Sequence, residues 1–186
     1  MKLAAVLREV CRGIVGKEAV VSRVLMAMLA EGHVLLDDAP GVGKTTLALA
    51  LSRAMGLRCS RVQFTPDVLP SDLVGFSMYE QDKGAFVYRQ GALSGANLIL
   101  GDEINRASSK TQSALLEAME EQTVTVDGVS HRLPAPFMVI ATQNELGYVG
   151  TFPLPEAQLD RFLMMIKMDY PSHDESIEIL KRFAAE

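Results

Sequence analysis

The stretch LLDDAPGVGKTTLALA, residues 35–50, constrains the possible fold more than any other part of the sequence. An apolar run leads into a short loop with two glycines and then into a helical sequence that opens with Lys44. We expect a strand that ends at Asp37, a loop, and a helix whose positive dipole end lies under that loop. Glycines let the backbone N–H groups of such a loop turn toward an anion. The order of these features therefore predicts a loop that binds the phosphates of a nucleotide.

The first residues of the predicted helix have the side chains that a triphosphate requires. Lys44 can reach the β- and γ-phosphates, and the hydroxyl of Thr45 can bind magnesium. The pattern G-x-x-x-x-G-K-[ST] is broken once, because Asp38 stands where its first glycine would be. Pro40 fixes one φ angle and an aspartate can hydrogen-bond its own downstream backbone, so the loop can still be shaped. A plain helix cap is the alternative interpretation of this stretch taken alone.

Composition restricts the class of protein. With 186 residues and a hydrophobic fraction of 48%, the chain can bury the core of one domain. A net charge of −5 argues against nucleic acid or an anionic membrane surface as the partner. No apolar run approaches the ~20 residues that span a bilayer, so we expect no membrane segment. Cys11 and Cys59 lie far apart in the sequence and are predicted to be reduced thiols of a cytoplasmic protein.

Strand-like apolar runs alternate with helical segments along the rest of the chain. After the first strand, the runs with the composition of buried strands are residues 58–64, 97–101, 137–142 and 162–168. Helical periodicity separates these runs. The sequence therefore predicts an α/β fold, a three-layer P-loop core with a five-stranded parallel sheet and helices on both faces.

Two segments do not fit this alternation and are predicted to be projecting hairpins. Residues 77–95 lack helical periodicity and contain the turn sequence QDKG. In TVTVDGVSHRL, residues 123–133, Asp127 and Gly128 predict a type I′ turn between β-branched runs. Upstream, in TPDVLPSDLVGF, we expect a single helical turn that Pro70 ends.

Polar side chains follow two of the predicted buried strands. In a parallel sheet, ligands bind beyond the carboxyl ends of the strands. Asp102 there offers magnesium a hard oxygen ligand, and Glu103 could take a proton from an attacking water. Asn144, after the next strand, could hold that water against the γ-phosphate. The alternatives are two solvated acids that cap a helix and an asparagine that only forms a turn.

Two long blocks extend these motifs. They are GDEINRASSKTQSALLEAMEEQTVTVDG and ATQNELGYVGTFPLPEAQLDRF. Both blocks resemble the MoxR family of AAA+ ATPases, and the similarity runs from about Gly13 to Tyr170. By this resemblance, residues 38–45 are the Walker A motif, in which the family tolerates a first residue other than glycine, and LILGDE is Walker B. The resemblance implies ATP and magnesium as cofactors, and hydrolysis that drives chaperone-like remodelling of a protein client.

The resemblance also implies roles for residues outside the phosphate loop. Asn144 matches the sensor asparagine of the family, and Arg161 in LDRF matches an arginine finger. Such an arginine acts in trans on ATP held by a neighbouring subunit, which implies a ring, commonly a hexamer; Arg106 is the alternative trans-acting residue. Relatives often work beside proteins with von Willebrand factor A domains. The two hairpins would lie where conformational change reaches the client.

The resulting candidate site has three parts. The catalytic residues would be Glu103, Asn144 and, in trans, Arg161, and the magnesium ligands would be Thr45 and Asp102. The apolar GIVG link before the second helix could line an adenine pocket. The predicted nucleotide-binding residues are Val15, Gly16, Asp38, Ala39, Pro40, Gly41, Val42, Gly43, Lys44, Thr45 and Thr46.

One departure from the family concerns the end of the chain. AAA+ proteins carry a helical lid with a second sensor arginine after the sheet domain, and this sequence ends at Glu186. We therefore expect residues 1–186 to be a single nucleotide-binding α/β domain without its lid, in a fragment or truncated form of a longer protein.

Other functional classes share the phosphate loop. A small-molecule P-loop kinase would need an acceptor site and a basic lid, whereas the Asp102-Glu103 pair with Asn144 favours water as the acceptor. A GTPase is disfavoured because the sequence has no N/T-K-x-D guanine motif. A DNA-acting AAA+ motor would need a basic hairpin at residues 123–133, where Asp127 offsets Arg132.

Overall fold

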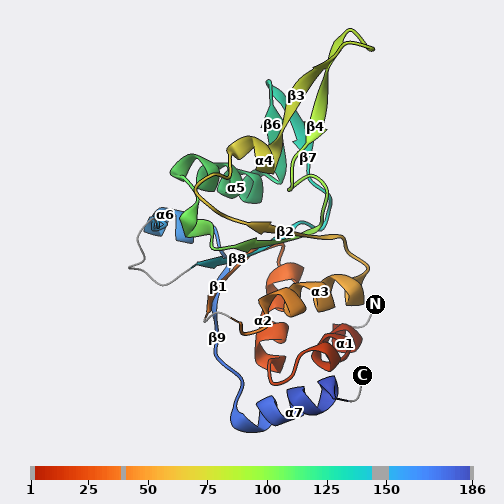
Figure 1. Cartoon of the computed structure of the whole chain (residues 1–186), viewed down its shortest axis with the longest axis vertical. Coiled ribbons are helices and arrows are strands. Elements are labelled where there is room, and N and C mark those ends of the chain that lie inside the picture. Colours follow the sequence, from red (N-terminus) through yellow and green to blue (C-terminus); the bar gives the residue numbers. More distant parts are fainter. Residues whose placement is uncertain (1–2, 39–40, 144–150, 185–186) are drawn as a thin grey trace.

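The centre of the protein is a five-stranded parallel sheet (Figure 1). The computed structural model describes residues 3–38, 41–143 and 151–184. The strands, in the sheet order β2-β5-β8-β1-β9, are β2 (Cys59–Gln63), β5 (Leu98–Asp102), β8 (Met138–Gln143), β1 (Val34–Asp38) and β9 (Met164–Met168). The continuous apolar runs β5 and β8 lie inside the sheet, where both faces are covered. The predicted α/β fold is confirmed.

The register brings the carboxyl ends of four strands to one edge. Gln63 of β2 pairs with Asp102 of β5, and Asp37 of β1 pairs with Gln143 of β8. Because β8 lies between β5 and β1, the loop after β1 and the acidic residues after β5 are separated by only one strand. This edge is where a parallel sheet binds its ligand.

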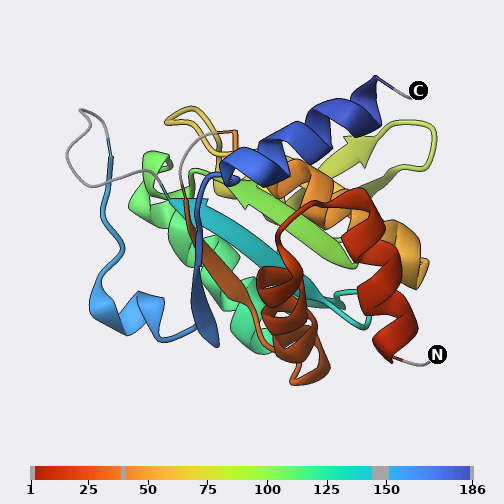
Figure 2. The same cartoon turned by 90° about the horizontal axis from the view of Figure 1, so that it is seen from below.

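Helices cover both faces of the sheet (Figures 1 and 2). The helices on one side are α1 (Leu3–Gly13), α2 (Glu18–Leu29), α3 (Lys44–Met55) and α7 (His173–Phe183). The other side carries α4 (Pro70–Val74) and α5 (Ser109–Glu121), and α6 (Glu156–Leu159) is a short helix before β9. Side chains of a strand alternate between the two cores: Val34 and Leu36 pack with the first layer and Leu35 with the second.

The sequence of α5 explains where this helix begins and which of its faces is buried. The Ser108 hydroxyl caps α5 by accepting a hydrogen bond from the Thr111 N–H at 3.3 Å. The apolar stripe of this helix is buried and consists of Leu115, Leu116, Ala118 and Met119. A 3-10 turn (Ile104–Arg106) links β5 to α5.

Two hairpins project from the same end of the molecule (Figure 1), as predicted. The first consists of β3 (Gly75–Glu80) and β4 (Ala85–Gln90), and the second of β6 (Thr123–Val126) and β7 (Val129–Arg132). Asp127 and Gly128 have φ angles of 51° and 76°, which is the type I′ geometry. The rings of Tyr88 and His131 stack with centroids 3.9 Å apart, so the hairpins contact each other.

The prediction for Pro70 was wrong. This proline begins α4 rather than ending a helical turn. A proline at the first position of a helix loses no hydrogen bond, because that N–H has no partner within the helix. The Asp72 carboxylate then caps the helix by accepting from the Leu69 N–H at 2.9 Å.

Two smaller expectations concern the cysteines and the membrane. Cys11 and Cys59 are free and partly buried, and burial raises the pKa of both thiols. Among the described residues, no helix has the length and apolar character needed to cross a bilayer.

Candidate nucleotide-binding site

The loop between β1 and α3 has the backbone that the glycines predict. Gly41 and Gly43 have φ angles of 80° and 95°, in the left-handed region that favours glycine. A Cβ built at either position meets no atom of the protein within 4 Å, so the requirement for glycine here is conformational. Gly43 also precedes the first residue of α3, which places the N–H groups of Lys44 and Thr45 at the start of the helix.

A cavity of about 400 Å³ opens beside this loop. It brings together residues that are far apart in the sequence: the predicted loop residues Gly41, Gly43, Lys44, Thr45 and Thr46, the acidic residues Asp102 and Glu103, and Arg61 and Gln63 of β2. The structure thus brings the predicted phosphate loop and the predicted acidic pair into one site. Ala39, Pro40, the side chain of Asp38 and the whole of Asn144 lie outside the described residues.

The Asp102 carboxylate is buried, with 4% of the residue exposed. Its Oδ2 accepts a hydrogen bond from Arg61 Nε at 2.6 Å, whereas Oδ1 has no hydrogen-bond partner in the described part of the chain. Buried carboxylate oxygens are normally paired, because an unpaired one loses its hydration without compensation. An orphan oxygen beside a phosphate loop therefore fits a magnesium ion or one of its waters.

The described residues offer such an ion no cluster of further ligands. In residues 3–38, 41–143 and 151–184, no group of three or more His, Cys, Asp or Glu side chains could hold a metal. Magnesium usually takes one or two protein groups plus substrate phosphates and water. Asp102 with the Thr45 hydroxyl fits this donor set, since both line the same cavity.

Glu103 has an unusual backbone. Its φ and ψ angles are 57° and 49°, a left-handed conformation that is uncommon for a residue other than glycine, asparagine or aspartate. The buried Thr142 hydroxyl accepts a hydrogen bond from the Glu103 N–H at 2.9 Å and helps to hold this turn. The Glu103 carboxylate forms an ion pair with Arg106 at 3.0 Å. Glu103 therefore lines the cavity while its carboxylate is already bound to one of the two candidate trans-acting arginines.

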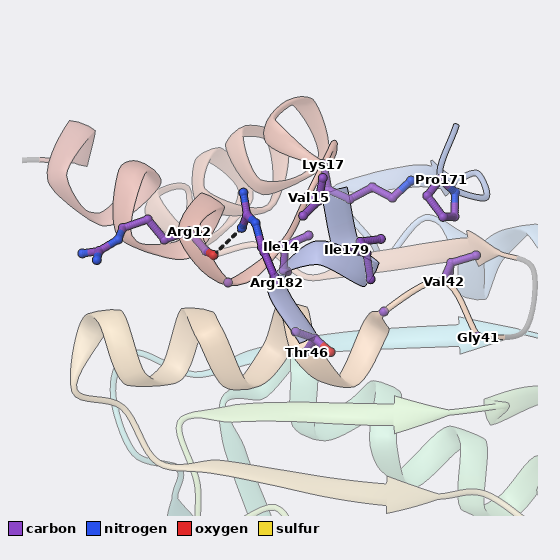
Figure 3. A pocket seen from close by; sticks show the side chains of 12 residues that line it. Arg12, Ile14, Val15, Lys17, Gly41, Val42, Thr46, Pro171, Ile179 and Arg182 are labelled. Carbon is purple, nitrogen blue, oxygen red and sulfur yellow. Dashed lines mark hydrogen bonds between the residues drawn. The ribbon is translucent and has the colours of Figure 1, made fainter. Parts of the chain in front are cut away.

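A second cavity of about 400 Å³ borders the same loop at Gly41, Val42 and Gly43 (Figure 3). Its walls are largely apolar, as a purine requires, and include Ile14 and the predicted Val15. α7 contributes Ile179 and Arg182, and the Arg182 Nη1 donates to the Arg12 carbonyl at 2.7 Å. Together with the phosphate cavity, with which it shares Gly41, Gly43 and Thr46, this space can hold the base of a nucleotide whose triphosphate lies at the loop.

The predicted Gly16 lies beside this second cavity but is not part of its lining. Its φ angle is 70°, and a Cβ at this position would overlap the carboxylate of Glu175. That carboxylate accepts a hydrogen bond from the Ser172 N–H at 2.7 Å, which together with nearby Lys17 lowers the pKa of Glu175. Gly16 thus provides the space in which the start of α7 approaches the base cavity. Lys17 donates to the Asp169 carbonyl at 2.6 Å, just before α7.

Arg161 lines neither cavity. It follows α6 and forms an ion pair with Glu120 of α5. Within one chain, the structure therefore does not bring Arg161 to the other predicted site residues, and its role in trans stays a prediction.

Sequence reasoning missed several residues that line or support the site. Arg61, Gln63 and Thr142 lie on strands whose polar positions resembled ordinary exposed or buried strand residues. Ile179 and Arg182 come from a helix far along the chain. The alternation of CSRVQ placed Arg61 and Gln63 on one side of β2, and that was the only available signal for them.

Comparisons with known proteins agree with this geometry. Residues 33–164 match the ATPase family associated with various cellular activities (AAA). The chain is 48% identical over 174 residues to the chaperone MoxR1 of Mycobacterium tuberculosis and 35% identical over 170 residues to the protein MoxR of Methylorubrum extorquens. It is also 53% identical over 178 residues to the uncharacterized protein YeaC of Bacillus subtilis.

These matches cover almost the whole chain but only part of each relative. They include 96%, 94% and 88% of this chain and 55%, 46% and 48% of YeaC, MoxR1 and MoxR, respectively. A solved structure of a candidate ATPase from Cytophaga hutchinsonii superimposes with a TM-score of 0.87 at 43% identity, covering 98% of this chain and 55% of that one. The chain thus spans about half the length of its relatives. The family match, the named relatives and the shared fold show that this chain belongs to the MoxR family of AAA+ ATPases.

Proposed function

We propose that this chain is the nucleotide-binding part of a magnesium-dependent ATPase that remodels or assembles a protein client. One observation carries the proposal: the phosphate cavity joins Lys44 and Thr45 of the loop to Asp102, whose buried Oδ1 is unpaired in the described residues, and to Glu103. A cation site and a carboxylate beside a phosphate loop are the parts that ATP hydrolysis needs.

The proposed reaction is the attack of water on the γ-phosphate. The water oxygen bonds to phosphorus while the bond from phosphorus to the β–γ bridging oxygen breaks, so that ADP and inorganic phosphate leave. Glu103 would take the proton of the water, and Asn144 would orient it. Lys44 would hold the β- and γ-phosphates. Magnesium, held by Asp102 and Thr45 together with phosphate oxygens, would neutralise the charge on the phosphates.

The assembly and the client belong to the same proposal. An arginine that acts in trans requires a ring, and Arg161, which lines neither cavity of its own chain, is suited to such a role. MoxR1 is named a chaperone, which supports a protein client. The exposed aromatic side chains of the first hairpin, such as Phe86 with 73% exposure, offer a surface for that client. A von Willebrand factor A domain protein is the partner type suggested by the family resemblance.

Substitution of Glu103 tests the catalytic part of the proposal. In the full-length protein, Glu103→Gln should leave ATP affinity within about twofold and lower the rate of phosphate release at least about a hundredfold, because a general base is removed while the size and shape of the side chain change little. Glu117→Gln, on the exposed face of α5, is the matched control and should retain wild-type turnover. Unchanged turnover in Glu103→Gln would contradict the assignment. With radiolabelled ATP, transfer of the label to an acceptor other than water would indicate a kinase instead.

Subunit mixing tests action in trans. Arg161→Ala and Glu103→Gln proteins should each be inactive alone, and a mixture of the two should regain ATPase activity, because some interfaces then combine an intact Arg161 with an intact Glu103. Arg106→Ala mixed with Glu103→Gln provides the comparison for the alternative arginine. A mixture with Arg161→Ala that regains no activity would argue against Arg161 as the trans-acting residue.

A further inference from the structure

The buried carboxylate of Asp102 has a partner that the proposed reaction does not use. Arg61 of β2 donates from Nε to Asp102 Oδ2 at 2.6 Å, although the two residues lie 41 positions apart in the sequence. The exposures differ sharply: 5% for the Asp102 side chain and 56% for that of Arg61. A charge-assisted hydrogen bond of this length fixes the orientation of the buried group, because the acceptor has no solvent to exchange with.

The sheet register explains why Arg61 reaches this position. β2 pairs with β5 so that Arg61 lies opposite Leu100 and Gln63 opposite Asp102. Alternate residues of a strand share one face, and both Arg61 and Gln63 line the phosphate cavity. The guanidinium therefore approaches Asp102 from the strand next to it, whereas the phosphate loop lies beyond β8.

The two oxygens of Asp102 are in different states. Oδ2 is occupied by Arg61, and the buried Oδ1 has no partner in the described residues. A carboxylate rotates about its last bond with a broad, roughly two-fold preference, so a bond to one oxygen also determines where the other points. If Arg61 competed with the metal, its guanidinium would be expected on the oxygen that the metal uses. Arg61 instead binds Oδ2 and leaves Oδ1 open.

We propose that Arg61 is a positioning residue for the magnesium site: it holds the Asp102 carboxylate by Oδ2 and thereby presents Oδ1 to the metal. This inference rests on the proposed function, in which Asp102 binds magnesium or its water. Arg61 acts through Asp102 and not by itself on the nucleotide. Its loss should therefore weaken the contribution of magnesium to nucleotide binding more than it weakens nucleotide binding without metal.

The experiment measures the affinity of a fluorescent ATP analogue with magnesium and with a chelator. For each protein, the dissociation constant measured with the chelator is divided by the one measured with magnesium. This ratio gives the enhancement of binding by magnesium. Arg61→Met, which keeps an unbranched side chain out to the position of Nε but lacks the guanidinium donor, should lower this ratio about tenfold, the smaller end of the range for a hydrogen bond to a charged group. Arg58→Met is the matched control, because Arg58 is exposed, directly precedes β2 at the end away from Gln63, and lines neither cavity.

A double-mutant cycle separates positioning from direct contact. In the Asp102→Asn background, Arg61→Met should have no further effect on the magnesium enhancement, because the residue through which Arg61 acts is already altered. Arg61→Lys, which keeps the charge but not the planar donor, should lower the ratio by several-fold and replaces Arg61→Met if that variant does not fold.

The other outcomes overturn the inference in recognisable ways. An equal loss of affinity with and without magnesium would make Arg61 a direct phosphate ligand, and an increased ratio would make it a competitor of the metal. If magnesium enhances binding to the wild-type protein and Arg61→Met has the same ratio, the role of Arg61 is refuted while the proposed function stands. A wild-type protein that binds no ATP analogue, or binds it without any effect of magnesium, would refute the proposed function itself.

Discussion

His33 offers a quantitative test of how the strand before the phosphate loop is held. It directly precedes β1 and is 4% exposed. Its Nδ1 accepts a hydrogen bond from the Val139 N–H at 3.0 Å, and its Nε2 lies 3.0 Å from the Met119 carbonyl. Because Nδ1 accepts, the proton of the neutral ring lies on Nε2, which donates to Met119. One buried imidazole thus connects β1, β8 and the end of α5.

The substitution His33→Leu keeps a side chain of similar size and removes both bonds. The Val139 N–H and the Met119 carbonyl are then buried without these partners, and each such loss costs about 1–3 kcal/mol. The sum is about 4 kcal/mol at the centre of the range, a large part of the 5–15 kcal/mol that is typical for a folded domain. At about 2–4 °C for each kcal/mol in a chain of this length, the melting temperature should fall by about 8–16 °C.

Mild acid should destabilise the wild-type protein through the same residue. Burial lowers the pKa of His33 below its usual value, with a smaller opposing effect from the bond to Met119. The unfolded chain therefore binds a proton at His33 more readily than the folded chain does. Stability from this group is complete above about pH 6.5, the value for an unfolded histidine, and is lost as the pH falls from there toward the pKa of the folded state.

Thermal unfolding at neutral pH measures the fall in melting temperature, and urea denaturation from neutral to mildly acidic pH measures the pH dependence. The wild-type protein should lose stability as the pH falls, and His33→Leu should lose less over the same interval, because its main pH-sensitive buried histidine is absent. His173→Leu at the exposed start of α7 is the control and should keep the wild-type pH dependence. If His33→Leu had the wild-type pH dependence, or a melting temperature as high as that of His173→Leu, the hydrogen bonds to His33 would not carry the stability attributed to them.

Two other substitutions probe the surroundings of the site. Gly16→Ala should lower the melting temperature and the affinity for ATP more than Gly84→Ala does: both glycines have left-handed φ angles, but only at Gly16 would an added methyl group overlap a neighbour, the Glu175 carboxylate. Equal effects of the two changes, measured by thermal unfolding and ATP titration, would show that only backbone conformation matters. Gln112→Leu should cost about 2 kcal/mol in urea denaturation, because the buried Gln112 amide donates to three backbone carbonyls between 3.0 and 3.3 Å away, and a cost below about 0.5 kcal/mol would contradict this.

The parts of the fold that were predictable depend on local rules. β5 and β8 are continuous apolar runs, and burial on both faces of a parallel sheet demands that composition. Asp127 and Gly128 adopt positive φ angles because a two-residue hairpin requires them, so the turn could be placed from two residues. The convergence of the loop with Asp102 and Glu103 followed from the rule that strand ends meet at one edge.

The parts that were not predictable depend on contacts between distant segments. Nothing near Arg61 in the sequence indicates Asp102, because their contact depends on which strand lies next to β5 and in what register. The contribution of α7 to the base cavity likewise depends on how a late helix packs on α1. The error at Pro70 has another cause: proline favours the first turn of a helix and also follows helix ends, so its position alone does not decide between the two.

The two candidate trans-acting arginines differ in which carboxylate of their own chain would become free if the arginine left its ion pair. Each is held by an acidic residue of its own chain, Arg106 by Glu103 and Arg161 by Glu120. These pairs are partly exposed and hence weak, about 0–1 kcal/mol, so a nucleotide on a neighbouring subunit could draw either arginine away. Departure of Arg161 would free Glu120, which lines neither cavity, and would leave the chemistry of its own chain unchanged. Departure of Arg106 would free the carboxylate proposed to accept the proton of the attacking water. An arginine finger at Arg106 would therefore make hydrolysis in one subunit depend on nucleotide in the next, whereas a finger at Arg161 would not.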